Sequence, residues 1–154
     1  MRAGKQQEHS YKTGARKARH GGVMHSHDPI AIARNLSPFE FRELAAFNGA
    51  AFCMFYGDRM AQSNWELHPD TDELLLVLKG SVTVEILTDS GHYRLPLSAG
   101  QFAIVPTGHW HRHVDVHDVI EMFFTPGTTV ESTADDPRLC GLPSPYEPAA
   151  KEQL

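Results

Sequence analysis

The segment most informative about the fold is Trp65-Glu66-Leu67-His68-Pro69-Asp70-Thr71-Asp72-Glu73. Polar positions alternate with mostly apolar ones from Gln62 to His68, as is typical of a β-strand. Successive side chains of a β-strand point to opposite faces, so residues two apart share a face. Apolar side chains, including Trp65 and Leu67, then fall on one face. The other face carries the polar row Gln62, Asn64, Glu66 and His68. We infer that this row faces a polar environment.

A second polar row lies on residues 109–117, which contain four of the ten histidines. The row consists of His109, His111, His113, Asp115 and His117, with Trp110, Val114 and Val116 opposite. Two such rows on separate strands could meet inside a barrel. Burying imidazoles and carboxylates together is costly unless they are paired or bind a metal. The two rows therefore predict a cavity suited to a divalent cation.

The hydrophobic pattern between residues 51 and 124 predicts eight short strands, separated by turn residues such as Lys79-Gly80 and Asp89-Ser90-Gly91. The strands are expected at residues 51–56, 62–68, 73–78, 82–88, 92–97, 101–105, 109–117 and 119–124. Strands this short and regularly spaced are typical of an antiparallel sandwich or barrel. The sequence thus predicts an all-β fold.

The N-terminal part of the chain divides into two segments. Residues 1–23 carry six basic residues and one acidic residue, a net charge of +5, and almost no large apolar residue. We predict a disordered basic tail, either an arm for an acidic partner or a leader before a natural start at Met24, and we favour the leader. Residues 24–48 contain the capping box Ser37-Pro38-Phe39-Glu40, which predicts a short helix over 38–47 that stops at Asn48-Gly49.

The remaining boundaries and the composition indicate one globular domain. We expect the barrel at residues 49–125 and a proline-rich strap or loose tail at 126–154. The chain has 154 residues, of which 41% are hydrophobic and 21% charged, as in an ordinary soluble domain. Its two cysteines, Cys53 and Cys140, are too few for a disulfide framework or a cysteine zinc site.

The charge distribution excludes some partners. The whole chain has a net charge of −5, so the body after residue 23 carries −10. An acidic body argues against nucleic-acid binding, which requires a basic face. No apolar run approaches the roughly 18 residues of a membrane span, and no signal-peptide core is present. We therefore expect no nucleic-acid or membrane partner and a cytoplasmic location.

Two motifs carry a family resemblance. The run from Trp65 to Glu73, followed after six residues by Gly80, resembles the first cupin motif, whose usual form is His-x-His, three or four residues, Glu, six residues, Gly. A later run resembles the second cupin motif and has Asp115 where asparagine is usual. It consists of Gly100, Pro106-x-Gly108, His111 and Asp115. The sequence is similar to small single-domain cupins of the Cupin_2 type over roughly residues 49–125. The resemblance implies a single cupin barrel, a double-stranded β-helix or jelly roll, and the N-terminal segment adds a short helix.

The resemblance also implies a metal site. His68 matches the second histidine of the first motif, Glu73 its glutamate and His111 the histidine of the second motif, whereas Glu66 stands where the first histidine is usual. We expect one divalent metal ion per chain, Fe(II), Mn(II), Zn(II) or Ni(II), with Glu66, His68, Glu73 and His111 as ligands. Without Glu66 the other three still form a two-histidine, one-carboxylate face. The alternative is a cupin that has lost tight metal binding.

Three residues are candidates for catalysis. Glu66 or His113 could transfer protons, and the hydroxyl of Tyr56 could hydrogen-bond a substrate. The plainer alternatives are an exposed rim position for His113 and a structural hydrogen bond for Tyr56. His109 is also on this row, and a rim position fits it better.

The run Leu74–Leu78 is apolar on both faces, which requires a cover on its outer side. Either a second copy of the chain or the helix predicted at 38–47 could supply it. Since cupins commonly dimerise, we favour a homodimer.

The sequence leaves several functions open. The first is a metal-dependent enzyme, a dioxygenase, lyase or isomerase, acting on a small polar or carboxylated substrate. Arg59 or Arg112 could hold such a carboxylate, although a solvated surface position is the simpler expectation for each. The alternatives are a non-catalytic small-molecule-binding or sensor cupin and a metal-free cupin similar to sugar isomerases or dehydratases.

Overall fold

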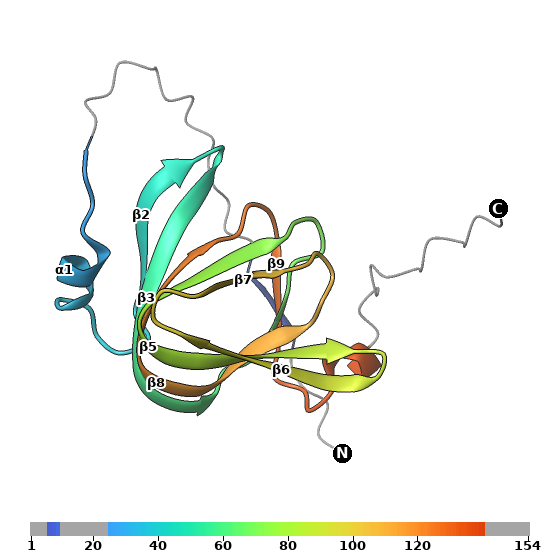
Figure 1. Ribbon diagram of the computed structural model, residues 1–154. Coiled ribbons are helices and arrows are strands. Elements are labelled where there is room, and N and C mark those ends of the chain that lie inside the picture. The colour runs from blue at the N-terminus through green and yellow to red at the C-terminus, as the bar shows by residue number, and fades with distance from the viewer. Residues whose placement is uncertain (1–5, 10–24, 141–154) are drawn as a thin grey trace, which may run out of the picture.

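A computed structural model describes residues 6–9 and 25–140 of the protein (Figure 1). Its strands form one antiparallel sheet that curls into a half-barrel, as the all-β cupin expectation requires. The elements are β1 (Gln6–His9), α1 (Pro29–Ala33), β2 (Phe41–Phe47), β3 (Ala50–Gln62), β4 (Trp65–Leu67), β5 (Glu73–Thr88), β6 (Gly91–Ser98), β7 (Phe102–Val105), β8 (His111–Phe124), β9 (Thr129–Ser132) and the 3-10 helix η1 (Pro137–Cys140).

Two long strands, β5 and β8, pair along most of their length and hold the sheet together. Each joins two strands that the sequence pattern separated. Lys79-Gly80, expected as a turn, instead lies inside β5, where the β5–β8 register shifts. Gly80 has φ +70, and a Cβ atom there would collide with the Asp118 carbonyl oxygen of β8. The glycine therefore permits an irregularity that bends the strand without ending it.

The prediction of a helix over residues 38–47 is wrong, because residues 41–47 form the strand β2. The Glu40 carboxylate does accept a hydrogen bond from the Ser37 backbone N–H at 3.2 Å, as half of a capping box. The chain then turns through Phe39, at φ +63, and continues as β2, which pairs with β3. Asn48 and Gly49, read as a helix stop, have φ +49 and +84 and form the tight turn between these two strands. Paired left-handed residues are typical of a type I′ hairpin, which Asn-Gly favours.

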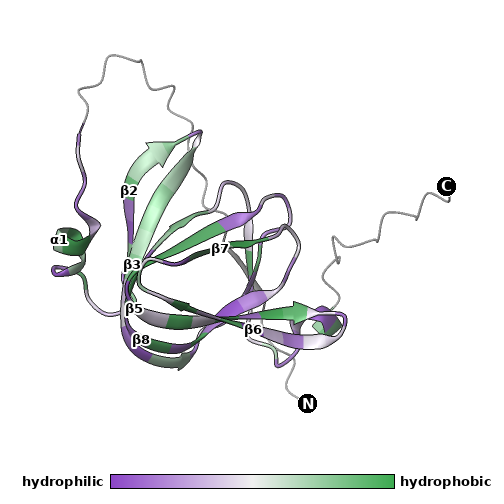
Figure 2. Cartoon of the chain, in the orientation of Figure 1, coloured by the Kyte–Doolittle hydropathy of each residue, from purple (hydrophilic) through white to green (hydrophobic). Residues whose placement is uncertain are grey.

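A short helix does occur earlier, at α1. The Asp28 side chain caps it by accepting a hydrogen bond from the Ala31 N–H at 3.0 Å, and Pro29 occupies its first turn. Figure 2 shows α1 as an apolar segment beside the sheet. Its buried Ala33 belongs to a core cluster with Met54 and Ile120 of the outer face. The expected N-terminal helix is thus present at a different position.

The main core fills the inside of the half-barrel. It is built from apolar side chains of the long strands and their neighbours, chiefly Phe55, Leu75, Val77, Val82, Val84, Leu97, Ala103, Val105, Val116 and Val119. A separate cluster of Trp65, Leu67, Leu87 and Trp110 packs on the opposite side of β4. Trp65 and Leu67 therefore face away from Glu66, as the predicted alternation requires, but the strand expected over 62–68 is interrupted at residues 63–64 between β3 and β4.

The flanking segments contribute strands to the same sheet. β2 pairs with β3, so the sheet starts earlier in the chain than the boundary expected at residue 49. β9 lies within the segment predicted as a strap and pairs with β4. Residues 6–9, within the segment predicted as a disordered tail, pair with β9. The rest of that tail and residues 141–154 lie outside the described part of the chain. In the described part, no helix is both long and apolar enough to cross a membrane.

The outer side of residues 74–78 is only partly covered. Leu78 packs in the α1 cluster, whereas Leu74 and Leu76 pair with Ile104 and Phe102 of β7. The side chains of Ile104 and Phe102 are 51% and 64% exposed. Since no helix forms at 38–47, that source of cover is ruled out. The homodimer stays a prediction.

Candidate metal centre and cavity

Four side chains from three parts of the sheet converge at one end of the half-barrel. Glu66 lies in β4, His68 directly follows it, Glu73 begins β5 and His111 begins β8. Glu66 and His111 are register partners. One ligand atom from each of the four residues can be chosen so that all lie within 4.8 Å of one another. These are the four residues that the sequence motifs selected.

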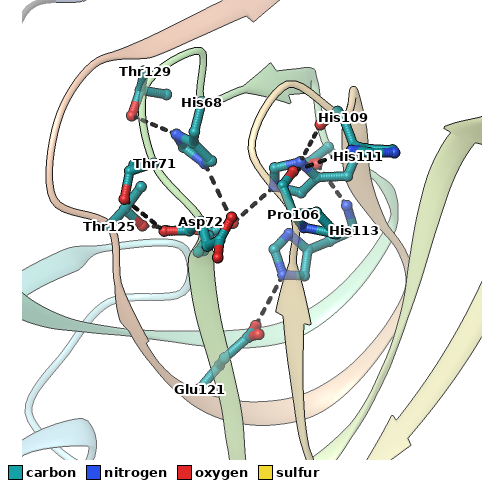
Figure 3. A network of polar contacts seen from close by, with 12 residues as sticks. His68, Thr71, Asp72, Pro106, His109, His111, His113, Glu121, Thr125 and Thr129 are labelled. Carbon is teal, nitrogen blue, oxygen red and sulfur yellow. Dashed lines mark hydrogen bonds and ion pairs between the residues drawn. The ribbon is translucent and has the colours of Figure 1, made fainter. Parts of the chain in front are cut away.

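Two imidazoles point at a single carboxylate oxygen. Oε2 of Glu73 lies 2.8 Å from Nε2 of His111 and 3.3 Å from Nε2 of His68. In Figure 3, dashed lines run from the rings of His68 and His111 toward the same carboxylate group. His68, Glu73 and His111 are buried, at 3%, 4% and 1% exposure, and His68 Nε2 makes no hydrogen bond among the described residues.

The opposite nitrogen of each ring fixes which atom can bind a cation. His111 Nδ1 lies 3.1 Å from the His109 carbonyl oxygen and His68 Nδ1 lies 3.4 Å from the Thr128 carbonyl oxygen. A carbonyl only accepts, so Nδ1 of His111 must donate. Nδ1 of His68 donates when it pairs with the Thr128 carbonyl, although the Thr129 hydroxyl also lies 3.2 Å from it. In a neutral ring Nε2 then carries a lone pair, and that lone pair faces the carboxylate of Glu73. Only a proton or a metal cation between them makes this arrangement favourable, so the residues fit a divalent metal.

The electrostatics of the cluster agree with this geometry. Burial alone would raise the pKa of Glu73, but the hydrogen bond from His111 and the nearby His68 imidazole hold it well below its usual value. Burial and the nearby Glu73 carboxylate raise the pKa of Glu66. Burial alone would lower the pKa of His68, yet Glu73 raises it. The second carboxylate is thus poorly stabilised as an anion unless a cation is shared with it.

Loops around the centre are tied to one another by hydrogen bonds. The Asp72 carboxylate accepts from both N–H and O–H of Thr107 at 2.8 Å, and the Gly108 N–H donates to the His68 carbonyl at 2.8 Å. The Thr125 hydroxyl donates to Oε1 of Glu73 at 2.7 Å. These contacts position both motif loops, so that the ligand side chains are held before any cation binds.

A buried pair lies next to the centre. His113 follows His111 on the same face of β8, and its Nε2 is 3.0 Å from Oε2 of Glu121, which is fully buried (Figure 3). Burial alone would lower the pKa of His113, but the Glu121 carboxylate raises it to about 9. The sequence analysis missed Glu121, although a carboxylate among the apolar residues Val119–Phe124 was a usable signal.

A cavity of about 310 Å³ opens beside the centre. Glu66, Glu73 and His113 line it, together with Gln62 and further residues of β2, β3 and β8. One wall is aromatic and consists of Phe39, Phe41, Phe55 and Phe123, which the sequence analysis did not single out. Of the predicted polar row, Gln62, Asn64 and Glu66 therefore line the cavity, whereas His68 is not among the lining residues.

Other candidates lie elsewhere. Tyr56 is not among the cavity-lining residues and packs on the outer face with the Met54 cluster, which removes the reason for placing it in the site. Arg112 pairs with Glu85 at 2.6 Å and lies over the Trp65 ring at 4.1 Å. Arg59 is exposed, and neither arginine lines the cavity.

The remaining histidines of the second row do not join the four ligands. Nδ1 of His109 lies 3.3 and 3.2 Å from the Pro106 and Thr107 carbonyl oxygens. His117 is exposed, as is Asp115, whose φ of +52 breaks the alternation of β8. After this irregularity Val116, expected opposite the polar row, lies in the main core.

Comparison with known families agrees with this architecture. Residues 58–125 match the family described as Cupin domain. These residues form a cupin domain. The match includes all four residues of the candidate metal centre. No curated protein gave a significant match to the sequence.

Solved structures share the cupin fold at low identity. A protein of Bacillus halodurans is 16% identical with a TM-score of 0.53, covering 77% of this chain and 87% of its own. Hydroquinone 1,2-dioxygenase of Sphingomonas sp. TTNP3, solved with 4-hydroxybenzoate bound, is 19% identical with a TM-score of 0.51, covering 73% and 83%. A hydroquinone 1,2-dioxygenase in complex with Cd²⁺ and 4-hydroxybenzonitrile is 17% identical with a TM-score of 0.51, covering 70% and 72%. These likenesses concern the fold.

Proposed function

We propose that this cupin is a metal-dependent enzyme that binds one divalent cation through Glu66, His68, Glu73 and His111 and acts on a small organic molecule in the adjoining cavity. The observation that carries the proposal is the pair of Nε2 atoms aimed at one carboxylate oxygen, with both Nδ1 atoms directed at carbonyl groups. Among enzyme classes we favour a dioxygenase, because two of the solved structures with the same fold are named as dioxygenases.

Each part of the site has a distinct task in this proposal. A bound cation would supply Lewis-acid or redox chemistry, depending on its identity. His68 and His111 present neutral nitrogen ligands whose orientation is fixed from behind. Glu73 and Glu66 balance the positive charge, so that a doubly charged cation meets two carboxylates.

The cavity positions the substrate against this centre. Glu66 belongs to both the ligand group and the cavity lining, so a substrate in the cavity lies within reach of its carboxylate. His113 lines the same space, and Glu121 holds its ring from behind at 3.0 Å. We assign His113 as the group that exchanges a proton with the substrate and Glu121 as the residue that orients it.

Metal content of defined variants tests the proposal. The protein, purified without a histidine tag, is stripped with a chelator and reloaded separately with Fe(II), Mn(II), Zn(II) or Ni(II), and metal per chain is counted by mass spectrometry. We expect one ion per chain, lost in His111→Ala and in His68→Ala. His117→Ala is the matched control, since it removes an exposed histidine of the same strand.

The outcomes separate the remaining functions. Full metal occupancy in both ligand variants would contradict the site. Metal binding without turnover of any added substrate would favour a binding or sensor cupin, and failure of every cation to bind would favour a metal-free cupin.

A further inference from the structure

We propose that the cavity selects a neutral molecule with a single aromatic ring, whose hydroxyl group points toward the centre. This inference rests on the proposed function, since it names the class of substrate for that site. It is carried by the distribution of rings, amides and charges around the cavity.

The aromatic wall is preassembled. The Phe41 ring centroid lies 5.6 Å from that of Phe55 and 5.8 Å from that of Phe123, the latter pair meeting edge to face at 82°. Aromatic rings favour further rings in offset or edge-to-face contact at such distances. Phe41 is nevertheless 61% exposed, so one ring of the cluster remains open to a ligand.

The backbone brings a fourth ring to this wall at an energetic cost. Phe39 has φ +63, a backbone conformation that residues other than glycine rarely adopt. Its backbone N–H donates to the Tyr56 carbonyl at 2.6 Å. A Cβ atom on Gly57 would lie 3.1 Å from the Phe39 ring and 3.2 Å from the Phe55 ring. The glycine therefore leaves room for both rings. Strain of this kind persists where the surroundings hold it and is common at binding sites.

The cavity lining also offers uncharged hydrogen-bonding groups. Gln62, Ser63 and Asn64 line the cavity. The Ser63 hydroxyl already has two partners. It accepts a hydrogen bond from the backbone N–H of His113 at 3.0 Å and donates one to the backbone carbonyl of Asn64 at 2.8 Å. The amide side chains of Gln62 and Asn64 make no hydrogen bond to another described residue and can contact a ligand at its outer edge.

The charges disfavour an anionic substrate. No lysine or arginine lines the cavity, whereas the carboxylates of Glu66 and Glu73 do. Nε2 of His113 already faces the Glu121 carboxylate at 3.0 Å and offers no free partner to an anion. With a divalent cation bound, the carboxylates Glu66 and Glu73 balance its charge. The carboxylated substrate expected from the sequence therefore has no free cationic partner among the lining residues.

The size of the cavity limits the ligand. A volume of about 310 Å³ lies at the lower end of the range for small-molecule pockets, roughly 300–1,000 Å³. One ring with a small substituent fits this volume. A hydroxyl on the ring can then donate to the Glu66 carboxylate at the inner end.

Three probes of similar size test the inference. Phenol is neutral and aromatic, cyclohexanol keeps the hydroxyl without the ring electrons, and benzoate keeps the ring but carries a charge. Binding of each is measured by ligand-observed NMR titration, without oxygen, to the Zn(II)-loaded protein and to the chelator-treated protein. We expect phenol to bind most tightly and benzoate least.

Two phenylalanines of β2 form a matched pair of variants. Phe41 lines the cavity, while Phe47, 52% exposed, does not. Phe41→Ala should weaken phenol binding roughly three- to tenfold, as expected for loss of one aromatic contact. Phe47→Ala should leave it unchanged. Both side chains are exposed, so neither substitution should unfold the protein.

The outcomes bear separately on the two proposals. Equal binding of phenol and cyclohexanol, tighter binding of benzoate, absence of phenol binding, or equal effects of Phe41→Ala and Phe47→Ala would each overturn the substrate class. Zinc bound at one ion per chain in the same samples would leave the metal centre intact. Selective phenol binding by a protein that retains no metal would support the substrate class and contradict the metal centre.

Discussion

His111 directs its Nε2 atom at Oε2 of Glu73, 2.8 Å away, from a ring whose Nδ1 atom faces a carbonyl oxygen. Without a metal cation, this contact requires a proton between the two atoms. With a cation, both residues become ligands and the ring stays neutral. Glu73 belongs to the first cupin motif and His111 to the second. A bound metal would take the place of the proton between them and so connect the two motifs.

Glu66→Gln should weaken metal binding without abolishing it. The change removes one carboxylate from the ligand group while His68, Glu73 and His111 remain. We expect the Mn(II) dissociation constant, measured by calorimetry, to rise roughly 10- to 100-fold. Glu43→Gln removes the same charge from an exposed position of β2 and is the control. An equal affinity in the wild type and Glu66→Gln would show that Glu66 is no ligand.

The buried His113–Glu121 pair should show strong energetic coupling. Glu121→Leu leaves the imidazole without its charge partner and should lower the free energy of unfolding by about 3 kcal/mol. The double variant His113→Phe/Glu121→Leu should recover at least about 1 kcal/mol of the summed single losses. Urea denaturation of the four proteins gives the coupling. Additive losses would mean that the pair does not interact.

Glu85 should stabilise the fold at neutral pH but not in acid. Burial opposes its charge, but Arg112 and Arg94 lower its pKa below the ordinary value of 4.5. A lowered folded-state pKa gives stability that is present above the unfolded-state pKa and lost as pH falls through the folded-state value.

We therefore expect Glu85→Gln to cost about 2 kcal/mol in the free energy of unfolding at pH 7. The difference from the wild type should shrink below about pH 4. Chemical denaturation at pH 7 and pH 3 measures it, with Glu43→Gln as the exposed control. A cost that is independent of pH would contradict the charge pairing.

Gly80→Ala should destabilise the sheet more than an equivalent change in an open turn. A Cβ atom at Gly80 would meet the backbone of Asp118, whereas one at Gly100, with φ +85, has nothing within 4 Å. Gly100→Ala should cost about 1 kcal/mol from its backbone conformation alone. Gly80→Ala should cost at least about 1 kcal/mol more. Equal midpoints of urea denaturation would remove the structural reason for Gly80.

The candidate site was more predictable from sequence than parts of the fold. The resemblance to the two cupin motifs selected Glu66, His68, Glu73 and His111 position by position. Alternation along the chain placed Glu66 and His68 on one polar face. The ends of the long strands were not predictable this way. Gly80 looked like a turn, since local sequence does not reveal that β8 pairs across the irregularity.

Tertiary pairing also explains the wrong helix at 38–47. Its capping contact between Glu40 and Ser37 forms, but pairing of β2 with β3 satisfies more backbone groups than a short helix would. Asn48-Gly49 was a hairpin signal read as a helix stop. Glu121 and the phenylalanine wall were missed because the cavity arises from strands far apart in the sequence.

Pulsed electron paramagnetic resonance of the Mn(II)-loaded protein tests the metal centre most directly, because it detects nitrogen nuclei bound to the metal. We predict modulation from two imidazole nitrogens in the wild type and in His117→Ala, and from one in His68→Ala if that variant is forced to bind Mn(II) at high concentration. Bound Mn(II) in the wild type with no nitrogen modulation would contradict the assignment of His68 and His111 as ligands.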